Sequence, residues 1–559
     1  MIRVALGQLN FTVGDIDGNA ARSVEAIRRS TQMGAQVLVL PELALTGYPP
    51  EDLVLKSGFV PANQRALEAV ASHTGDLLTV VGFVDADEEH LYNAAAICHG
   101  GEVKAIYRKQ LLPNYGVFDE RRYFEPGDRH TLIDTHHGVV GVCVCEDIWS
   151  PTGPAISQGD AGAQVMLNIN ASPFHKGKID ERAHMLGERA RRSTASIVYV
   201  NLVGGQDELV FDGGSLVLDK QGELIARLAQ FEETLQVVDV PLGEARTGRS
   251  DSVDRLQLSL SDSEGDITPL PIEPPLDESE EIYRALRLSL RDYITKNGFS
   301  KVALGLSGGI DSTLVATICA DALGPDNVLA VAMPSEFSTS HSLDDARELA
   351  DNLGIKLHTI PIKSVYHSFL EVLQDSFGEV EPGVAEENLQ ARIRGTLLMT
   401  VSNRSGHLII VTGNKSENAV GYATLYGDMA GGFALIRDLF KHEVYALCRW
   451  RNSVSTVIPQ NVLTKAPSAE LRPDQKDEDS LPPYEVLDPI LEAYIERDEG
   501  VDEIMAHGFD EQVVVEVISL VDRAEFKRRQ APPGPKVSVK SFGRDRRLPI
   551  TNRWQPKSS

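Results

Sequence analysis

The sequence predicts an α/β protein made of two domains. Short β-rich runs alternate with helical stretches over residues 1–245, and the same alternation resumes at residue 281. The composition changes between them, and 559 residues exceed what one hydrophobic core ordinarily serves. We therefore expect a first domain at 1–245, a linker at 246–280 and a second domain at 281–559.

Strands and helices of the first domain can be placed from its apolar pattern. The predicted strands are runs of aliphatic and β-branched residues at 3–8, 37–40, 77–83, 138–143, 165–169 and 196–202. Helices are expected at 19–33 and 178–193. The run at 3–8 has the character of a first strand and not that of a basic-then-apolar signal peptide.

Beyond the first domain the pattern changes and then repeats. Residues 246–280 are acidic, rich in serine and proline and weakly periodic, which predicts a linker or surface excursion. A helix from Glu281 then leads to strands at 301–306, 328–333, 356–361 and 408–412, each followed by a helical pattern. That order predicts a doubly wound parallel sheet with its ligand at the carboxyl edge of the strands. Residues 467–483 are expected to form a mobile loop.

Composition argues against several functional classes. The formal net charge of −27 argues against general nucleic-acid binding, and no stretch is apolar enough to span a membrane. Five cysteines are an odd number in a long chain, which suggests reduced thiols and a cytoplasmic setting. An acidic total does not exclude nucleotides as ligands, because nucleotide binding depends on local loops and metal ions.

The most informative motif joins a strand to a helix at residues 305–312, Gly-Leu-Ser-Gly-Gly-Ile-Asp-Ser. Glycines let the backbone approach a phosphate, and the free N–H groups at a helix N-terminus favour negative charge. Asp311 would repel a bare phosphate but suits one bridged by Mg²⁺. The loop lacks the lysine of the kinase-type phosphate loop. An ordinary Gly-Ser turn is the alternative, but the whole string between strand and helix favours a nucleotide site.

This string resembles the pyrophosphate loop of ATP pyrophosphatases, which split ATP into AMP and pyrophosphate to activate a carboxylate or carbonyl. The resemblance implies an adenine nucleotide alpha hydrolase-like fold for the second domain. It further implies that Asp311 holds Mg²⁺ and that ATP is bound by Gly305, Leu306, Ser307, Gly308, Gly309, Ile310, Asp311 and Ser312.

A second constellation lies in the first domain, where Glu42, Lys109 and Cys145 each follow a predicted strand. A thiol nucleophile, a carboxylate that takes its proton and an ammonium that stabilises an oxyanion can together hydrolyse an amide. Each residue has an ordinary alternative: a small core cysteine, a solvated turn carboxylate and a surface lysine beside Arg108. Cys143 lies inside the strand and is interpreted as a packing residue.

In their order and context the three residues resemble the triad of the nitrilase superfamily, whose fold is an α-β-β-α sandwich. Three further strings resemble the glutaminase domain of glutamine-dependent NAD synthetases. These are Leu-Pro-Asn-Tyr-Gly-Val-Phe-Asp-Glu at 112–120, Cys-Glu-Asp-Ile-Trp at 145–149 and Asn-Ala-Ser-Pro-Phe at 170–174.

This resemblance implies which side chains surround the amide substrate. Tyr115, Ser172 and Lys178 would contact glutamine, with Lys178 standing where many relatives have arginine. Glu146 and Glu120 are candidates for supporting the site, with solvated or capping carboxylates as the alternative interpretation.

The resemblance continues through the second domain and so covers most of the chain. It implies that Thr412 touches the adenosine part of ATP and that Glu417 binds Mg²⁺ or the dinucleotide. Asn388 and Arg392 match a dinucleotide-contacting helix. Lys527 matches a segment that closes over substrate phosphates, although a solvated basic run is the alternative.

The function implied is a ligase that adenylates the nicotinate carboxylate of deamido-NAD and amidates it with ammonia from glutamine. Its partners would be deamido-NAD, ATP and glutamine, with Mg²⁺ as cofactor, in a homo-oligomer. Free ammonia is mostly protonated at neutral pH, so a protected tunnel between the two sites is a further hypothesis.

Two other functions share part of this pattern. A purine-nucleotide amidotransferase would contain the same ATP loop, but it resembles a different glutaminase fold. A catalytically silent binding or regulatory protein would keep both folds. The presence of Glu42, Lys109, Cys145 and Asp311 together argues against it.

Overall fold

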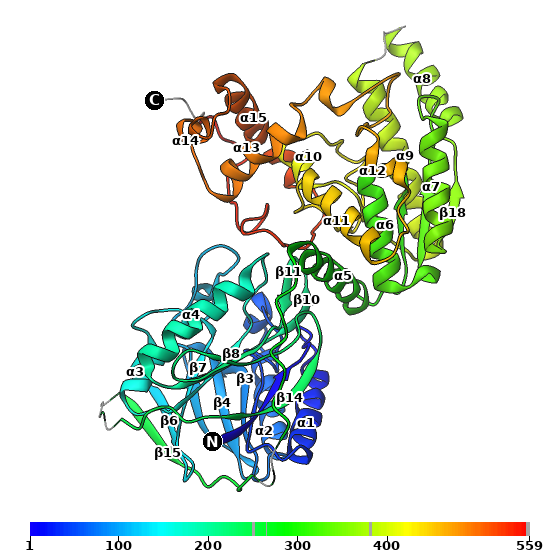
Figure 1. Cartoon of the computed structure of the whole chain (residues 1–559). Coiled ribbons are helices and arrows are strands. Elements are labelled where there is room, and N and C mark those ends of the chain that lie inside the picture. The colour runs from blue at the N-terminus through cyan, green and yellow to red at the C-terminus, as the bar shows by residue number, and fades with distance from the viewer. Residues whose placement is uncertain (247, 249–251, 264, 266, 379–382, 555–559) are drawn as a thin grey trace. The chain divides into compact units, whose positions relative to one another are not determined.

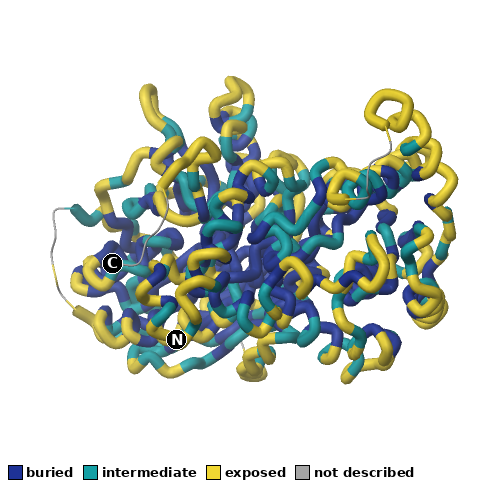
Figure 2. The backbone as a smooth tube through the Cα atoms, turned by 90° about the horizontal axis from the view of Figure 1, so that it is seen from above, coloured by how far each residue is buried: buried dark blue, intermediate teal, exposed yellow. Residues whose placement is uncertain are grey.

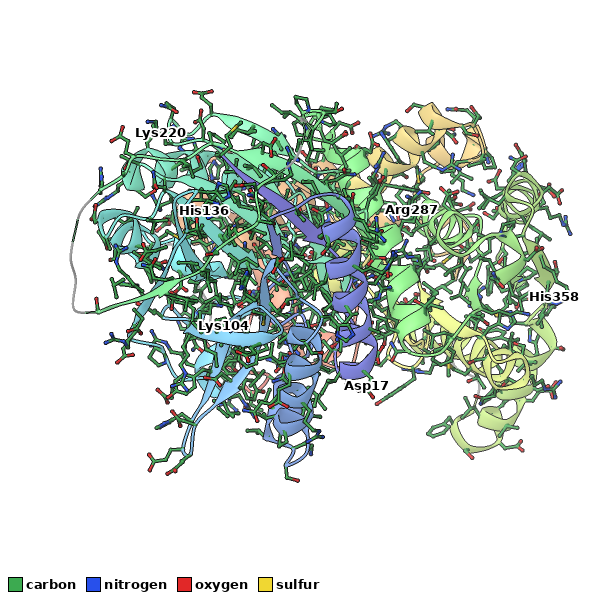
Figure 3. All side chains as sticks on the ribbon, turned by 90° about the horizontal axis from the view of Figure 1, so that it is seen from below. Asp17, Lys104, His136, Lys220, Arg287 and His358 are labelled. Atoms are coloured by element: carbon green, nitrogen blue, oxygen red, sulfur yellow. The ribbon has the colours of Figure 1, made fainter. Side chains whose placement is uncertain are left out.

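The structure of the protein is a computed structural model that describes residues 1–554 except 247, 249–251, 264, 266 and 379–382. The chain divides into two compact units, one formed by 1–206 and 210–276 and the other by 207–209 and the chain from Asp277 onward. Buried backbone lies inside and exposed backbone outside (Figure 2). Exposed polar side chains such as Asp17, Arg287 and His358 project from the surface (Figure 3).

Two β-sheets make up the centre of the first unit. One has the strand order β14-β1-β2-β3-β4-β5, and the other has the order β13-β12-β9-β8-β7-β6-β15. The bounds in the first sheet are β1 Ile2–Gln8, β2 Val37–Val39, β3 Leu78–Ala86, β4 Leu91–His99, β5 Glu102–Arg108 and β14 Thr234–Val240. Those in the second are β6 His130–Asp134, β7 Val139–Val144, β8 Val165–Asn170, β9 Ser196–Asn201, β12 Leu216–Leu218, β13 Leu224–Arg227 and β15 Val253–Gln257. A separate pair of strands is formed by β10 Val203–Gln206 and β11 Leu209–Asp212.

Helices cover the outer faces of both sheets (Figure 1). α1 (Ile16–Gln32) and α2 (Phe59–Ala71) pack on the first sheet, while α3 (Pro154–Asp160) and α4 (Lys178–Ser193) pack on the second. One apolar cluster joins strands of both sheets to α3 and α4, and it includes Val4, Val80, Val142, Leu167 and Leu186. This confirms the α-β-β-α sandwich.

All six strands predicted for this unit are present, but β4, β5, β6 and β10–β15 were not predicted. β4 has the sequence Leu-Tyr-Asn-Ala-Ala-Ala-Ile-Cys-His, and alanine favours helices in isolation. Pairing with β3 and β5 on either side makes it a strand nevertheless. The small side chains lie fully buried between the layers.

The segment 246–280 differs from the expected linker. Its strand β15 pairs in parallel with β6, and the first unit extends to Leu276. β15 is an edge strand with exposed or half-exposed residues throughout, so its sequence carries no apolar signal. Residues 247, 249–251, 264 and 266 of the predicted linker lie outside the described residues.

The second unit is built on one parallel sheet with the order β18-β17-β16-β19-β20. The strand bounds are β16 Val302–Gly305, β17 Val328–Ala332, β18 Lys356–Thr359, β19 Leu408–Val411 and β20 Phe433–Ala434. α8 (Lys363–Phe377) and α9 (Val384–Ser405) cover one face. Further helices pack around the sheet, namely α5 Glu278–Lys296, α6 Ile310–Leu323, α7 Ser340–Leu353 and α11 Lys441–Val454. The predicted doubly wound parallel sheet is confirmed.

The end of the chain adds a helical subcore. α13 (Tyr484–Glu496), α14 (Val501–Ala506) and α15 (Glu511–Arg523) share an apolar cluster with α10 (Lys415–Val420). Shorter helices are α12 Gln460–Thr464 and α16 Glu525–Arg528. The predicted loop at 467–483 contains a single 3-10 turn, Asp477–Asp479. Across the described residues, no helix has both the length and the apolar character needed to cross a membrane.

Candidate active sites

Cys145 directly follows strand β7, at a tight turn. It opens the 3-10 turn Cys145–Ile148 with a left-handed φ of 43°, which is unusual for a residue other than glycine. The buried Asp147 carboxylate holds this turn, because it accepts the backbone N–H of Val144 at 3.1 Å and of Leu111 at 2.8 Å. Burial raises the pKa of Asp147 to about 6. The turn therefore fixes where the thiol points.

Glu42 and Lys109 form a buried ion pair. Lys109 Nζ lies 2.7 Å from Glu42 Oε1, and both side chains are fully shielded from solvent. Glu42 Oε1 also accepts the side-chain amide of Asn93 at 2.7 Å, and Oε2 accepts the backbone N–H of Ala171 at 2.9 Å. These three partners come from separate parts of the chain and fix the carboxylate in one orientation.

A second carboxylate completes the surroundings of Lys109. Glu120 Oε1 lies 2.8 Å from Lys109 Nζ and accepts the hydroxyl of Tyr48 at 3.0 Å. Burial alone would lower the pKa of Lys109, but Glu120 and Glu42 hold it well above its usual value. Burial raises the pKa of Glu120 to about 7. Lys109 therefore remains a cation in a buried site.

The three predicted triad residues are brought together from three strand ends. Burial and the charge of Glu42 raise the pKa of Cys145 well above its usual value, while Lys109 lowers it. The resting group is thus a neutral thiol, and it needs a nearby base before it can act as a nucleophile. Glu42 is the carboxylate with the largest electrostatic effect on it.

Side chains predicted to contact the amide substrate lie around this centre. The hydroxyl of Tyr115, a largely exposed residue, donates to Glu146 Oε2 at 3.0 Å. Lys178 Nζ pairs with Glu181 at 2.9 Å and lies 4.3 Å from the centroid of the Trp149 ring. Burial raises the pKa of Glu146 and lowers that of Lys178.

The Ser307–Ser312 loop leaves β16 and enters α6. Ser307 Oγ lies 3.1 Å from Ser312 Oγ and accepts the backbone N–H of Gly309 at 3.2 Å. Gly308 has a φ of 80°, and a Cβ there would lie 2.1 Å from the carbonyl oxygen of Ser342. The loop is therefore a tight turn that only glycine can make at position 308.

A cavity of about 330 Å³ opens over this loop at the carboxyl ends of the strands, as predicted. Its lining includes Thr412 after β19, Glu417 on α10 and Lys441 on α11. Residues 467–471 and Asp477, from the segment predicted as a loop, also line it. The ATP-site residues placed on the cavity wall are Gly305, Leu306, Ser307, Gly309, Ile310, Asp311, Ser312 and Thr412.

Asp311 and Glu417, the two predicted metal carboxylates, share one lysine. Lys441 Nζ lies 2.6 Å from Asp311 Oδ2 and 3.2 Å from Glu417 Oε1. Asn414 donates its side-chain amide to Asp311 Oδ1 at 2.8 Å. Burial raises the pKa of Glu417 to about 8, and the two carboxylates hold that of Lys441 above its usual range. This oxygen donor set suits a hard divalent cation.

Comparison with known proteins identifies both halves of the chain. A family model described as NAD synthase matches residues 282–531, and one described as carbon-nitrogen hydrolase matches residues 3–250. The glutamine-dependent NAD(+) synthetase of Thermotoga maritima is 48% identical over 573 aligned positions, covering 99% of each chain. This chain belongs to the glutamine-dependent NAD(+) synthetase family.

Other glutamine-dependent NAD(+) synthetases agree with this. The Aquifex aeolicus relative is 46% identical over 99% of this chain and 100% of its own. The solved structure of the enzyme from Acinetobacter baumannii, in complex with ADP, has 40% identity, a TM-score of 0.76 and complete coverage of both chains. The structure from Cytophaga hutchinsonii has 21% identity and a TM-score of 0.79 over 99% of this chain and 98% of its own, which shows a shared fold.

In the NAD synthetase half, three predicted dinucleotide residues gather on the segment 421–428. Asn388 Oδ1 accepts the Thr424 hydroxyl at 2.7 Å, and Arg392 donates to the Leu425 carbonyl at 3.2 Å. Lys527 Nζ donates to the carbonyls at 421 and 423. Among the described residues that line the cavity over the ATP loop, these three do not appear, whereas Glu417 does.

Several residues of these sites gave no clear sequence signal. Asn93 lies on β4, which was not predicted as a strand, and Tyr48 and Asp147 are tied to the first site only by folding. Lys441 begins α11 after a two-residue strand that is too short to detect. Asp147 stands in the Cys-Glu-Asp-Ile-Trp string, which could have identified it.

Gly308→Ala should abolish ATP binding by this NAD synthetase, since the new methyl group would strike the Ser342 carbonyl. Equilibrium titration with an ATP analogue measures this. Gly298→Ala is the matched control, because Gly298 has nearly the same φ, 77°, but open space around it. The control should lose only about 1 kcal/mol of stability and still bind. Equal binding by both variants would show that the close contact at 308 is not needed.

Proposed function

We propose that the first unit hydrolyses glutamine and that the second unit uses the ammonia to amidate deamido-NAD at the expense of ATP. The products are NAD, glutamate, AMP and pyrophosphate, as the family implies. The observation that carries this assignment is the pairing, on one chain, of the buried Glu42–Lys109–Cys145 cluster with the Ser307–Ser312 loop over a cavity.

In the first reaction Cys145 is the nucleophile and Glu42 is its base. Glu42 takes the thiol proton as the sulfur attacks the amide carbon of glutamine, and it returns a proton to the leaving ammonia. Lys109, a cation with two carboxylate partners, stabilises negative charge on the amide oxygen. Glu42 then activates the water that hydrolyses the thioester to glutamate.

Glutamine would be held by side chains around the thiol. Tyr115, Ser172 and Lys178 are the proposed contacts, and Glu146 supports Tyr115 through its hydrogen bond. Lys178 stands at the first turn of α4 and carries a charge suited to the substrate carboxylate. Glu146 is suited to the substrate ammonium.

In the second reaction ATP would occupy the cavity with its phosphates on the Ser307–Ser312 loop and its adenosine near Thr412. Asp311 and Glu417 would hold Mg²⁺, and their carboxylate oxygens fit it. When bound, Mg²⁺ neutralises phosphate charge as pyrophosphate leaves. Lys441 lies between the two carboxylates. Once these carboxylates bind Mg²⁺, Lys441 is placed to pair with phosphate oxygens of ATP.

The acceptor carboxylate must be activated before ammonia can attack it. Adenylation of the nicotinate carboxylate gives AMP as a good leaving group, and ammonia then forms the amide. Asn388, Glu417 and Lys527 are the proposed contacts of deamido-NAD. Ammonia must arrive unprotonated, so we further propose a protected path for it from Cys145.

The chain should form a homo-oligomer in the cytoplasm. α8 exposes apolar side chains at positions that share one face of a helix, because they lie 4, 7, 8 and 12 positions after the first of them. These residues are Val365, Phe369, Val372, Leu373 and Phe377. Such a stripe is suited to an interface between copies of the chain. All five cysteines are free thiols, which suits a reducing compartment.

An acceptor screen tests the proposed reaction. The chain is incubated with ATP, Mg²⁺, glutamine and one acid at a time, and AMP, pyrophosphate and the amidated product are quantified. Deamido-NAD should give equal amounts of AMP and NAD, and purine nucleotide acceptors should give neither. Amidation of a purine nucleotide without NAD formation would contradict the proposal.

A further inference from the structure

Beyond the triad, the first unit contains a buried ion pair that the proposed reaction does not use. Arg182 on α4 and Asp212 at the end of β11 are both fully buried, and Arg182 Nη1 lies 2.7 and 2.8 Å from the two carboxylate oxygens. The other terminal nitrogen, Nη2, donates to the Ser172 carbonyl at 2.9 Å and to Ser172 Oγ at 3.3 Å.

Ser172 is held from its other side by Asn201. The Ser172 backbone N–H donates to Asn201 Oδ1 at 2.9 Å, and Asn201 Nδ2 donates back to the Ser172 carbonyl at 3.3 Å and to Asp212 Oδ1 at 3.4 Å. The preceding residue, Ala171, donates its N–H to Glu42 Oε2. The Arg182 network therefore binds the backbone of Ser172, while the Glu42 carboxylate binds the backbone of its neighbour Ala171.

Stability alone does not explain this ion pair. Removing two charges from water is costly, and apolar replacements of such pairs are often neutral or stabilising. Arg182 Nε, moreover, has no hydrogen-bond partner among the described residues. A buried donor without a partner costs free energy, so this ion pair is not optimised for stability.

The Arg182 charge also acts within the site. Burial would lower the pKa of Arg182, but Asp212 reverses this and Cys145 in its thiolate form adds to the effect, so its pKa lies above its usual range. The Arg182 charge also lowers the pKa of Lys178, which lies one helical turn earlier on α4. Arg182 is thus a fixed cation close to both the nucleophile and a proposed glutamine contact.

We propose that Arg182, held in place by Asp212, is a positioning residue for glutamine hydrolysis: it fixes Ser172 for the substrate and the Ala171 peptide against Glu42. The inference rests on the proposed glutaminase function of the first unit. A guanidinium suits this place because its two terminal nitrogens act on different partners. Nη1 contacts both Asp212 oxygens while Nη2 donates to the carbonyl and hydroxyl of Ser172, whereas an ammonium has a single nitrogen.

The test compares Arg182→Met with Arg191→Met, a control on the same helix whose side chain is exposed. Arg182→Met should lower kcat/KM for glutamine by about 100-fold, mainly through KM, because Ser172 is no longer oriented. Ammonia-dependent NAD synthesis should stay unchanged and reports that the protein is folded. Arg191→Met should match the wild type in both assays. An unchanged kcat/KM in Arg182→Met would overturn the inference.

A double variant separates positioning from simple charge neutralisation. Arg182→Met leaves Asp212 buried without a partner and so should lower Tm, whereas Arg182→Met with Asp212→Leu should recover Tm. If positioning is the role, the double variant stays about 100-fold impaired with glutamine. Wild-type kinetics in the double variant would overturn the inference. Absence of glutamine hydrolysis in the wild type would instead contradict the proposed function itself.

Discussion

Replacing Cys145 by alanine should abolish NAD synthesis from glutamine while leaving synthesis from ammonium salts intact. The thiol is the only proposed atom that bonds covalently to glutamine, and its loss should lower the glutamine-dependent rate by a factor on the order of 10⁴ or more. The residues that line the ATP cavity all lie between Gly305 and Asp477, in the second unit. Because Cys145 belongs to the first unit, ammonia-dependent turnover should change by less than about twofold. Parallel assays of NAD formation with glutamine and with ammonium chloride measure both rates.

Cys143→Ala is the matched control for this experiment. Cys143 lies two residues earlier on β7, is equally buried, and its sulfur is 3.2 Å from the side-chain nitrogen of Asn168. Its replacement removes a buried sulfur but no proposed catalytic atom, so glutamine-dependent synthesis should persist. Loss of both activities in Cys145→Ala would show that Cys145 does more than supply ammonia. Equal loss in both variants would point to a packing effect.

Asp311→Ala should remove NAD synthesis with either nitrogen donor. The change takes away one proposed Mg²⁺ carboxylate and leaves Lys441 paired with Glu417 alone. We expect a loss of at least about 10³-fold, because pyrophosphate would depart without charge neutralisation. Glutamine hydrolysis by the first unit should remain measurable as glutamate release.

Mn²⁺ binding followed by electron paramagnetic resonance provides a readout independent of turnover. Asp311→Ala should weaken it in the presence of an ATP analogue. Asp326→Ala, at an exposed carboxylate in the same unit, should behave as the wild type in both assays. Ammonia-dependent synthesis retained by Asp311→Ala would contradict the metal role assigned to this residue.

Much of the fold was predictable because its central strands are parallel and buried. Such strands are continuous apolar runs that end where polar residues begin, so β1, β8 and β16 could be placed within one residue. Their ends also position the chemistry. Glu42, Lys109 and Cys145 each follow a strand, and the structure places all three in one buried cluster.

Elements whose identity depends on tertiary pairing were not predictable. The alanines of β4 carry no strand signal of their own, and the polar edge strand β15 resembles a linker. Site residues that lie on such elements, or that reach a site only through folding, were therefore not predicted either. The contact of Asn93 with Glu42 requires that β4 be a strand, and Lys441 contacts Asp311 although the two residues are 130 positions apart in the sequence.

Cavity walls were only partly predictable for the same reason. The segment 467–483 has the composition of a surface loop, yet it supplies lining residues of the ATP cavity. Asn388 and Lys527 contact the segment 421–428 instead of that cavity, so their assignment to deamido-NAD depends on where the dinucleotide lies relative to this segment.

Transfer of isotope from glutamine to NAD tests the central claim most directly. The chain is given ATP, Mg²⁺, deamido-NAD and glutamine labelled with ¹⁵N in its amide, together with unlabelled ammonium in the medium. Our account predicts that the NAD formed carries ¹⁵N in its carboxamide, and that Cys145→Ala yields only unlabelled NAD under the same conditions. Unlabelled NAD from the wild-type chain, while it hydrolyses glutamine, would contradict the coupling of the two sites.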